Sequence, residues 1–195
     1  TINMMCLGIE ANKKKIADLL VYLSSEIDKI TLKKLLKIIY LIDECAMEKR
    51  GIPVTWLEYK VWKYGPVSPE IYNIKNAGGI FADDIRVAKN DLDKYEIFPK
   101  REIDFTQFSK NEKKIIKDVV SRYGHMSADE LSDLTHEDGK LWKDAVKANN
   151  LVFDETHTKT DVSIDLESIL KDATACEIYN EARECVEFQA ALNRA

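Results

Sequence analysis

Residues 31–53 read TLKKLLKIIYLIDECAMEKRGIP, and this stretch decides what kind of fold the chain forms. Thr31 is a good helix N-cap, and Gly51 followed by Pro53 is a typical helix end. Between them, seven apolar side chains cover most of the circumference of a helix: Leu32, Leu35, Leu36, Ile38, Ile39, Leu41 and Ile42. A helix that is apolar nearly all round is usually buried. We therefore predict a central core helix over residues 32–49.

Helical patterns lie on both sides of this central helix. Two capping boxes, Ser109 with Glu112 and Ser127 with Glu130, mark the starts of helices that carry apolar stripes. The last helix is expected to start at Ser163. We predict further helices over residues 12–27, 69–77, 109–123, 127–134, 140–148 and 163–193.

Two segments favour β-structure. Residues 84–89 and 94–98 flank a polar turn and are typical of a hairpin. Residues 54–64 are aromatic and β-branched and end at Gly65-Pro66, which is expected to turn the chain; periodicity allows a short strand or an irregular segment there.

These elements predict a mainly α fold, a single compact helical domain with a small β-hairpin or short sheet and a C-terminal helical extension. Residues 1–150 are expected to form the domain, and residues 151–195 a polar linker followed by an acidic helix. Residues 163–195 hold seven acidic and three basic side chains.

Composition narrows the class of function. The 195 residues carry 34 acidic and 29 basic side chains, a net charge of −5, so the basic excess that drives direct nucleic-acid binding is missing. The sequence has no apolar run near the roughly 18 residues that a membrane span needs, nor a signal-peptide layout at its start. We expect a cytoplasmic protein with no membrane partner.

Catalytic and cofactor patterns are weak. His125, His136 and His157 have no metal-ligand spacing, and no glycine-rich phosphate loop is present, so no metal or cofactor is expected. One enzyme alternative is a hydrolase that uses His136 with Asp133 or Glu137, but no nucleophile accompanies these residues. We predict that the protein is not an enzyme.

Two lysine clusters allow two interpretations. Lys13, Lys14 and Lys15 lie on one predicted helix, and the second cluster on the next is Lys33, Lys34 and Lys37. They form either a patch for phosphate contacts or, as we expect, the solvent-exposed faces of two amphipathic helices.

One aromatic constellation stands out as a candidate binding site. Trp and Tyr side chains near a Gly-Pro pair offer rigid apolar area with hydrogen-bonding groups, as in protein–protein hot spots. The alternative is that the tryptophans are core residues and the Gly-Pro pair only turns the chain. The candidate residues are Trp62, Tyr64, Gly65, Pro66, Val67, Tyr72, Leu134, His136 and Trp142.

At these residues the sequence resembles the Panacea domain family, the SocA-like antitoxins that include phage-associated GepA-like proteins. Residues 32–41 resemble the family's L-x-K-L-L-Y helix, although two residues separate Leu36 from Ile39-Tyr40. Residues 61–72, VWKYGPVSPEIY, are close to its W-x-[YH]-G-P-V-x-x-x-[VI]-Y signature. LSDLTH, with Trp142 after it, matches its third block, and the resemblance spans roughly residues 14–148.

The resemblance implies a non-enzymatic domain of a prokaryote or phage that neutralises a cognate protein toxin, the product of a neighbouring gene, by direct binding. A second possibility that it implies is a proteolytic adaptor that delivers the toxin to an AAA+ protease. The resemblance assigns no catalytic residue, and the motif residues either contact the toxin or maintain the fold. The acidic C-terminal helix is our candidate for the toxin-facing element; the alternative is that it packs back on the domain.

Overall fold

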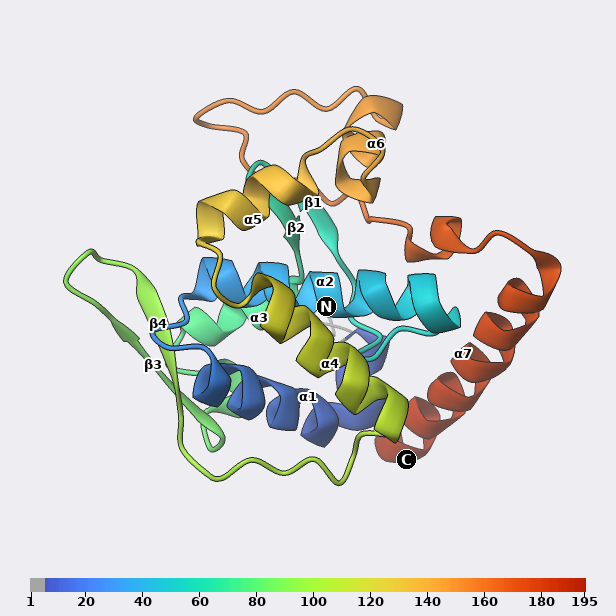
Figure 1. Cartoon of the computed structure of the whole chain (residues 1–195), viewed down its shortest axis with the longest axis horizontal. Helices are drawn as coiled ribbons and strands as arrows, with labels where there is room; N and C mark the ends of the chain where they lie inside the picture. The colour runs from blue at the N-terminus through green and yellow to red at the C-terminus, as the bar shows by residue number, and fades with distance from the viewer. Residues whose placement is uncertain (1–5) are drawn as a thin grey trace.

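The structure, a computed structural model, describes residues 6–195 and is mainly α-helical (Figure 1). The α-helices are α1 (Leu7–Glu26), α2 (Leu32–Arg50), α3 (Pro69–Tyr72), α4 (Lys110–Tyr123), α5 (Ala128–Thr135), α6 (Leu141–Ala148) and α7 (Ala173–Arg194). The strands are β1 (Lys60–Trp62), β2 (Gly65–Val67), β3 (Ile85–Lys89) and β4 (Tyr95–Pro99), which form two antiparallel pairs. Short 3₁₀ turns are η1 (Asn73–Lys75), η2 (Gly79–Phe81) and η3 (Leu166–Ile169). The predicted fold class is confirmed.

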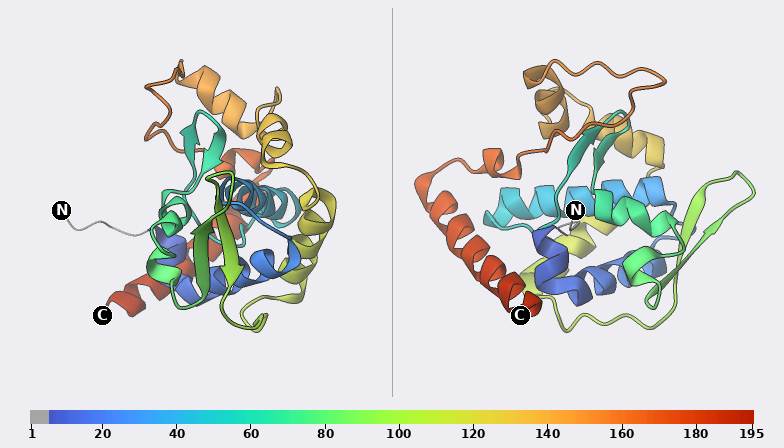
Figure 2. Two further views of the ribbon diagram at one scale, coloured as in Figure 1. Left: turned by 90° about the vertical axis from the view of Figure 1, so that its left-hand side faces the viewer. Right: turned by 180° about the vertical axis from the view of Figure 1, so that it is seen from behind.

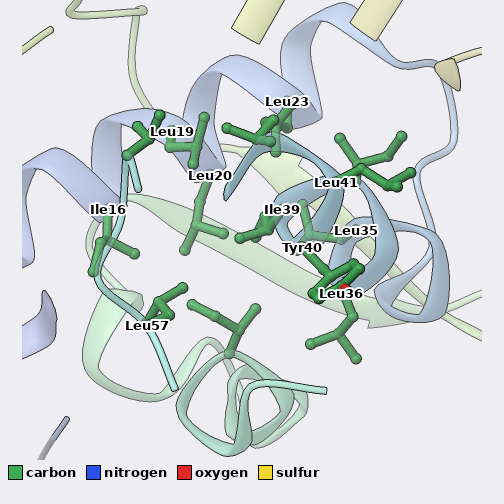
Figure 3. Packing of buried hydrophobic residues seen from close by; sticks show 14 of the residues in the cluster. Ile16, Leu19, Leu20, Leu23, Leu35, Leu36, Ile39, Tyr40, Leu41 and Leu57 are labelled. Carbon is green, nitrogen blue, oxygen red and sulfur yellow. The ribbon is translucent and has the colours of Figure 1, made fainter. Parts of the chain in front are cut away.

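Helix α2 is the centre of the core, as predicted. The Thr31 side chain accepts a hydrogen bond from the backbone N–H of Lys34, and Gly51 ends the helix in the left-handed region at φ 69°. Helix α4 packs against α2, and α1 runs beside α2 with its apolar side chains in the same core (Figure 1). Figure 3 shows Leu20 of α1, Ile39 of α2 and Leu57 from the following loop filling the space between the elements.

Helix α1 begins earlier than the apolar stripe predicts. It starts at Leu7 and breaks at Asn12, where φ is −152° and the backbone leaves the helical region. The carbonyls of Glu10 and Ala11 beside this break accept hydrogen bonds of 3.0 Å from the side chain of Asn193 on α7. The last helix therefore satisfies backbone groups that the broken first helix leaves open.

The two β-hairpins differ from each other in how well the sequence predicts them. The β3–β4 hairpin is confirmed, and the Ile97 N–H donates to the Ile30 carbonyl at the start of α2. In the β1–β2 hairpin, Trp62 is paired with Gly65, so the turn is made by Lys63 and Tyr64. The expectation that Gly65-Pro66 turns the chain is wrong, because both residues belong to β2.

The segment predicted as a polar linker lies along the free edge of β1. The Lys63 N–H donates to the Thr158 carbonyl, and the Val61 N–H donates to the Val162 carbonyl, each at 2.9 Å. Ser163 pairs with Lys60 in an extended bridge. The predicted start of the last helix at Ser163 is therefore wrong, because pairing with the sheet edge outweighs the capping tendency of a serine.

Helix α7 begins ten residues later, at Ala173, after Asp172 caps it by accepting a hydrogen bond from the Ala175 N–H. It packs against α1 at one end of the molecule (Figures 1 and 2). Within α7, only Tyr179 and Ala190 are buried, and the Tyr179 ring lies 5.2 Å from that of Trp56. Most of the helix surface faces solvent.

Candidate functional site

A groove of about 630 Å³ lies beside the N-terminal half of α2. Its walls come from the β1–β2 hairpin, α3, the start of α5, the start of β4 and the segment that runs along β1. These elements are far apart in the sequence, and α2 brings them together because each packs against it or against a neighbour that does.

Four of the nine candidate residues line this groove: Trp62, Tyr64, Val67 and Tyr72. The rings of Trp62 and Tyr72 meet edge to face with their centroids 4.8 Å apart. Tyr64 is 55% exposed at the hairpin turn, whereas Val67 is buried. The second motif block thus contributes an aromatic wall that has one exposed end.

Gly65 and Pro66 lie under the groove, against Lys37. The Lys37 ammonium donates a hydrogen bond of 3.1 Å to the Pro66 carbonyl, and the whole side chain is 2% exposed. Gly65 has φ +105°, and a Cβ on it would lie 2.6 Å from Lys37 Nζ, so only glycine fits here. The expectation that Lys37 lies on a solvent-exposed face is wrong, because the β1–β2 hairpin covers it.

Burial has an electrostatic consequence at Lys37. Removal of the ammonium from water, together with the smaller effect of the Lys33 charge, lowers the pKa of Lys37 to about 7. The Pro66 carbonyl is a neutral acceptor, so this hydrogen bond orients the ammonium without supplying a compensating negative charge.

The third motif block supports the groove from behind. Trp142 is 6% exposed, and its indole N–H donates to the Trp62 carbonyl at 2.9 Å. The His136 ring stacks on Trp142 with centroids 3.7 Å apart, and Leu134 is half-buried against the core. This block fixes the position of β1, so its members lie next to the groove wall rather than on it.

The His136 ring is half-buried and has no hydrogen-bonded carboxylate that could act with it in catalysis. Burial lowers the pKa of His136 to about 4, and the charge of Lys37 adds to the shift. Within residues 6–195, neither Asp133 nor Glu137 forms a hydrogen bond to the ring, and Nε2 is buried without a partner. The groups that the hydrolase alternative needs are not hydrogen-bonded to one another in this arrangement.

The groove is rich in lysine, although the chain as a whole is acidic. Seven lysines line it, and among the described lining residues Asp129 is the one carboxylate, 2.5 Å from Lys33. Sequence reasoning singled out three of the seven and missed four, since these come from separate segments and form no local pattern. The seven are Lys29, Lys33, Lys34, Lys37, Lys75, Lys94 and Lys159.

Two of the three lysines in the other predicted cluster pair with carboxylates, and the third, Lys13, is exposed as expected. Lys14 forms ion pairs with Asp18 and Asp104 at 2.9 and 2.7 Å, and Lys15 pairs with Glu112 at 2.7 Å. These contacts join α1 to the loop before α4 and to the first turn of α4. This cluster therefore contributes to packing between elements.

The exposed face of α7 is a second notable surface. Glu177, Glu181 and Glu184 recur at helical spacing, and exposed Phe188 and Leu192 continue the same face. Phe188 is 66% exposed and Leu192 54%. Large apolar side chains this exposed next to a row of carboxylates are typical of an interaction surface.

Neither a membrane span nor a metal cluster is found in the part of the chain that the structure describes. No helix of residues 6–195 is long and apolar enough to cross a bilayer. The same residues contain no group of three or more His, Cys, Asp or Glu side chains placed to hold a metal ion.

Comparison with known proteins gives one match. A family model described as "Antitoxin SocA-like, Panacea domain" matches residues 35–143, a segment that includes most of α2, both hairpins, and α5 up to the start of α6. No curated protein and no solved structure matches the chain significantly. The match contains all nine candidate residues and leaves α7 outside.

Proposed function

This chain belongs to the SocA-like antitoxin family defined by the Panacea domain, since that family's match covers more than half of its 195 residues, and from this premise we propose that it neutralises a protein toxin by binding it directly. The antitoxin family suggests a non-enzymatic role, and its members imply a toxin as partner. The family match is the observation that carries the proposal. The toxin is the product of a neighbouring gene, and the complex forms in the cytoplasm.

The exposed face of α7 is the surface that we assign to the toxin. It is acidic, it carries two exposed apolar side chains, and it lies outside the segment that the family shares. Toxins that act on RNA, nucleotides or ribosomes have basic surfaces, and an acidic partner gains association rate from complementary charge. Phe188 and Leu192 supply apolar contact area beside these charges.

The motif residues are better suited to maintaining the fold than to choosing the toxin. Trp142, Val67 and Lys37 are buried, and Gly65 is held in a conformation that favours glycine. Buried side chains hold the hairpin against α2 and cannot reach a partner without unfolding it. A partner-specific surface is expected instead on an exposed element such as α7.

A native pull-down tests the proposal directly. Tagged full-length protein is purified from its source strain, and co-purifying chains are identified by mass spectrometry. We expect a small stoichiometric protein that arrests growth when expressed alone and is harmless when co-expressed with this chain. A partner whose half-life falls sharply on co-expression, together with a co-purifying AAA+ protease, would favour the adaptor alternative over sequestration.

Charge removal on α7 tests the assigned surface. Glu177→Gln, Glu181→Gln and Glu184→Gln together should slow association with the toxin about tenfold at low salt, because electrostatic steering is lost. The matched control is Asp83→Asn, Asp91→Asn and Glu155→Gln, which removes the same charge from exposed carboxylates elsewhere. An equal loss of association in the control would show that net charge, rather than α7, is responsible.

A further inference from the structure

The groove carries a concentration of lysine side chains that plays no part in the proposed binding of a toxin by α7. Four of its lysines, Lys29, Lys75, Lys94 and Lys159, lie outside ion-pairing distance of any carboxylate in residues 6–195. Lys34 donates to the Gly124 carbonyl and also lacks an anionic partner, whereas burial lowers the pKa of Lys37 to about 7, so Lys37 carries only part of a charge near neutral pH. Such a concentration of positive charge in a chain of net charge −5 attracts anions to the groove.

The N-terminus of α2 adds to this positive potential. Thr31, the N-cap of α2, lines the groove, and the first turn of this helix holds no acidic residue. The backbone N–H groups of a first helical turn carry partial positive charge and favour bound phosphate. The start of α5 also lines the groove, but Asp129 and Glu130 in its first turn offset its partial charge. The lysines and the start of α2 therefore act on the same space.

The aromatic wall favours a planar group beside the anion. The Lys159 ammonium lies 4.5 Å from the ring centroid of Trp62 and 4.7 Å from that of Tyr72, and the Lys75 ammonium lies 4.0 Å from Tyr72. A flexible, exposed lysine that rests on an aromatic ring is easily displaced by a planar group that stacks there. The displaced ammonium then stays close enough to pair with a phosphate.

We propose that this groove binds a nucleoside polyphosphate, with the base stacked on the Trp62–Tyr72 wall and the phosphates among the lysines and the N-terminus of α2. The groove volume of about 630 Å³ is within the range of small-molecule sites. The hydroxyl groups of Thr31, Ser127 and Thr158 line the same space and offer hydrogen bonds to the base or ribose.

A polyphosphate fits the groove better than an acidic peptide does. It places several negative charges within a few ångströms, whereas a peptide carboxylate supplies one charge. A peptide strand would also need an open sheet edge, and residues 158–163 already occupy the edge of β1. The proposal does not rest on toxin neutralisation, because the groove and the exposed face of α7 are separate surfaces.

Isothermal titration calorimetry of the full chain tests the site. The probes are ATP, GTP, sodium tripolyphosphate and adenosine, titrated in low-salt buffer with EDTA. We expect ATP or GTP to bind one to one, and about tenfold more tightly than tripolyphosphate or adenosine, because base and phosphates contribute together. Absence of ATP and GTP binding, or equal affinity for tripolyphosphate and ATP, would overturn the proposal.

Matched charge variants locate the binding. Lys75→Gln with Lys159→Gln should weaken ATP binding at least tenfold, whereas Lys13→Gln with Lys117→Gln, an equal charge change on exposed lysines elsewhere, should leave it unchanged. Thermal melting confirms that both variants are folded. Equal losses in the two variants would overturn the assignment of the site.

Two further results would reassign the groove. Tighter binding of single-stranded oligoadenylate than of ATP would overturn a free nucleotide as the ligand. If the native chain binds no ATP and the Lys75→Gln, Lys159→Gln variant loses toxin binding, the groove is a protein-binding surface instead. Loss of ATP binding with toxin neutralisation intact supports the proposal and leaves the antitoxin assignment standing.

Discussion

The groove lies beside the N-terminal half of α2, whereas α7 begins near the C-terminal end of that helix (Figure 1), and the two regions differ in charge and in burial. The groove is basic, belongs to the segment that the family shares, and rests on buried side chains such as Lys37 and Trp142. Helix α7 is acidic, lies outside that segment, and buries only two of its residues, Tyr179 and Ala190, while Asn193 adds hydrogen bonds to α1. The groove therefore depends on the packing of the core, whereas the exposed face of α7 can change with little effect on that packing.

The largest effect is expected from replacing Trp142, which supports the groove, when it is compared with replacing an exposed residue of α7. Trp142→Ala removes a buried indole and its hydrogen bond to the Trp62 carbonyl, so it should lower the free energy of unfolding by about 3–5 kcal/mol. Phe188→Ala on α7, which is 66% exposed in the native chain, should change it by less than about 0.5 kcal/mol. Urea denaturation measures the free energy of unfolding of both variants. Equal losses would contradict the view that the groove depends on core packing and the exposed face of α7 does not.

Gly65 gives the next largest effect. Gly65→Ala forces a side chain into φ +105° and against the Lys37 ammonium and Thr135 hydroxyl, so it should cost about 2 kcal/mol. Gly139→Ala is the matched control, because Gly139 also has positive φ, +81°, but no atom lies within 4 Å of the new Cβ. The control should cost about 1 kcal/mol by urea denaturation. A larger cost for the control would mean that crowding by Lys37 contributes nothing.

His136 predicts how stability changes with pH. Its folded pKa of about 4 lies below the ordinary 6.5, so between these values the unfolded chain binds more protons than the folded one. The contribution of His136 to the free energy of unfolding should therefore be fully present above pH 6.5. It should decrease by about 1 kcal/mol for this half-buried group as the pH falls toward 4. His136→Gln should remove that part of the slope, whereas His157→Gln at an exposed position should retain it. An unchanged slope in His136→Gln would refute the assignment.

The smallest effect is expected where α7 meets α1. Asn193→Ala removes the two hydrogen bonds to the Glu10 and Ala11 carbonyls and should cost about 0.5–1 kcal/mol. Hydrogen exchange should show faster opening of α7 with little change in α2. Asn180→Ala, at an exposed position on the same helix, serves as the control. Faster exchange throughout the core would mean that α7 is not a separately opening element.

The sequence predicts the elements whose signals are local. The central helix, both capping boxes and the β3–β4 hairpin follow from neighbouring residues, and their physical causes act within one or two turns of chain. The start of α7 was missed because Ser163 pairs with Lys60, 103 residues away. A capping preference worth about 1 kcal/mol is weak beside a long-range sheet pairing.

The candidate site is predictable only in part for the same reason. Trp62, Tyr64 and Tyr72 are found from a compact motif, and Lys37 is found as a charge on a helix, with the wrong exposure. Helical periodicity places a residue on a face but does not say which element covers that face. Lys159 has no sequence signal, since its place over Trp62 depends on a strand pairing that links distant parts of the chain.

The pairing of residues 158–163 with β1 also sets an order of events during synthesis. Thr160 binds the Val61 carbonyl across 99 residues, and Lys159 completes the aromatic wall next to it. A nascent chain that emerges from the ribosome can fold α1 and α2 first, but its groove stays open until residue 163 has been released. Until then the outer edge of β1 lacks its partner segment and presents unpaired backbone groups, the feature of a sheet edge that favours pairing with other chains.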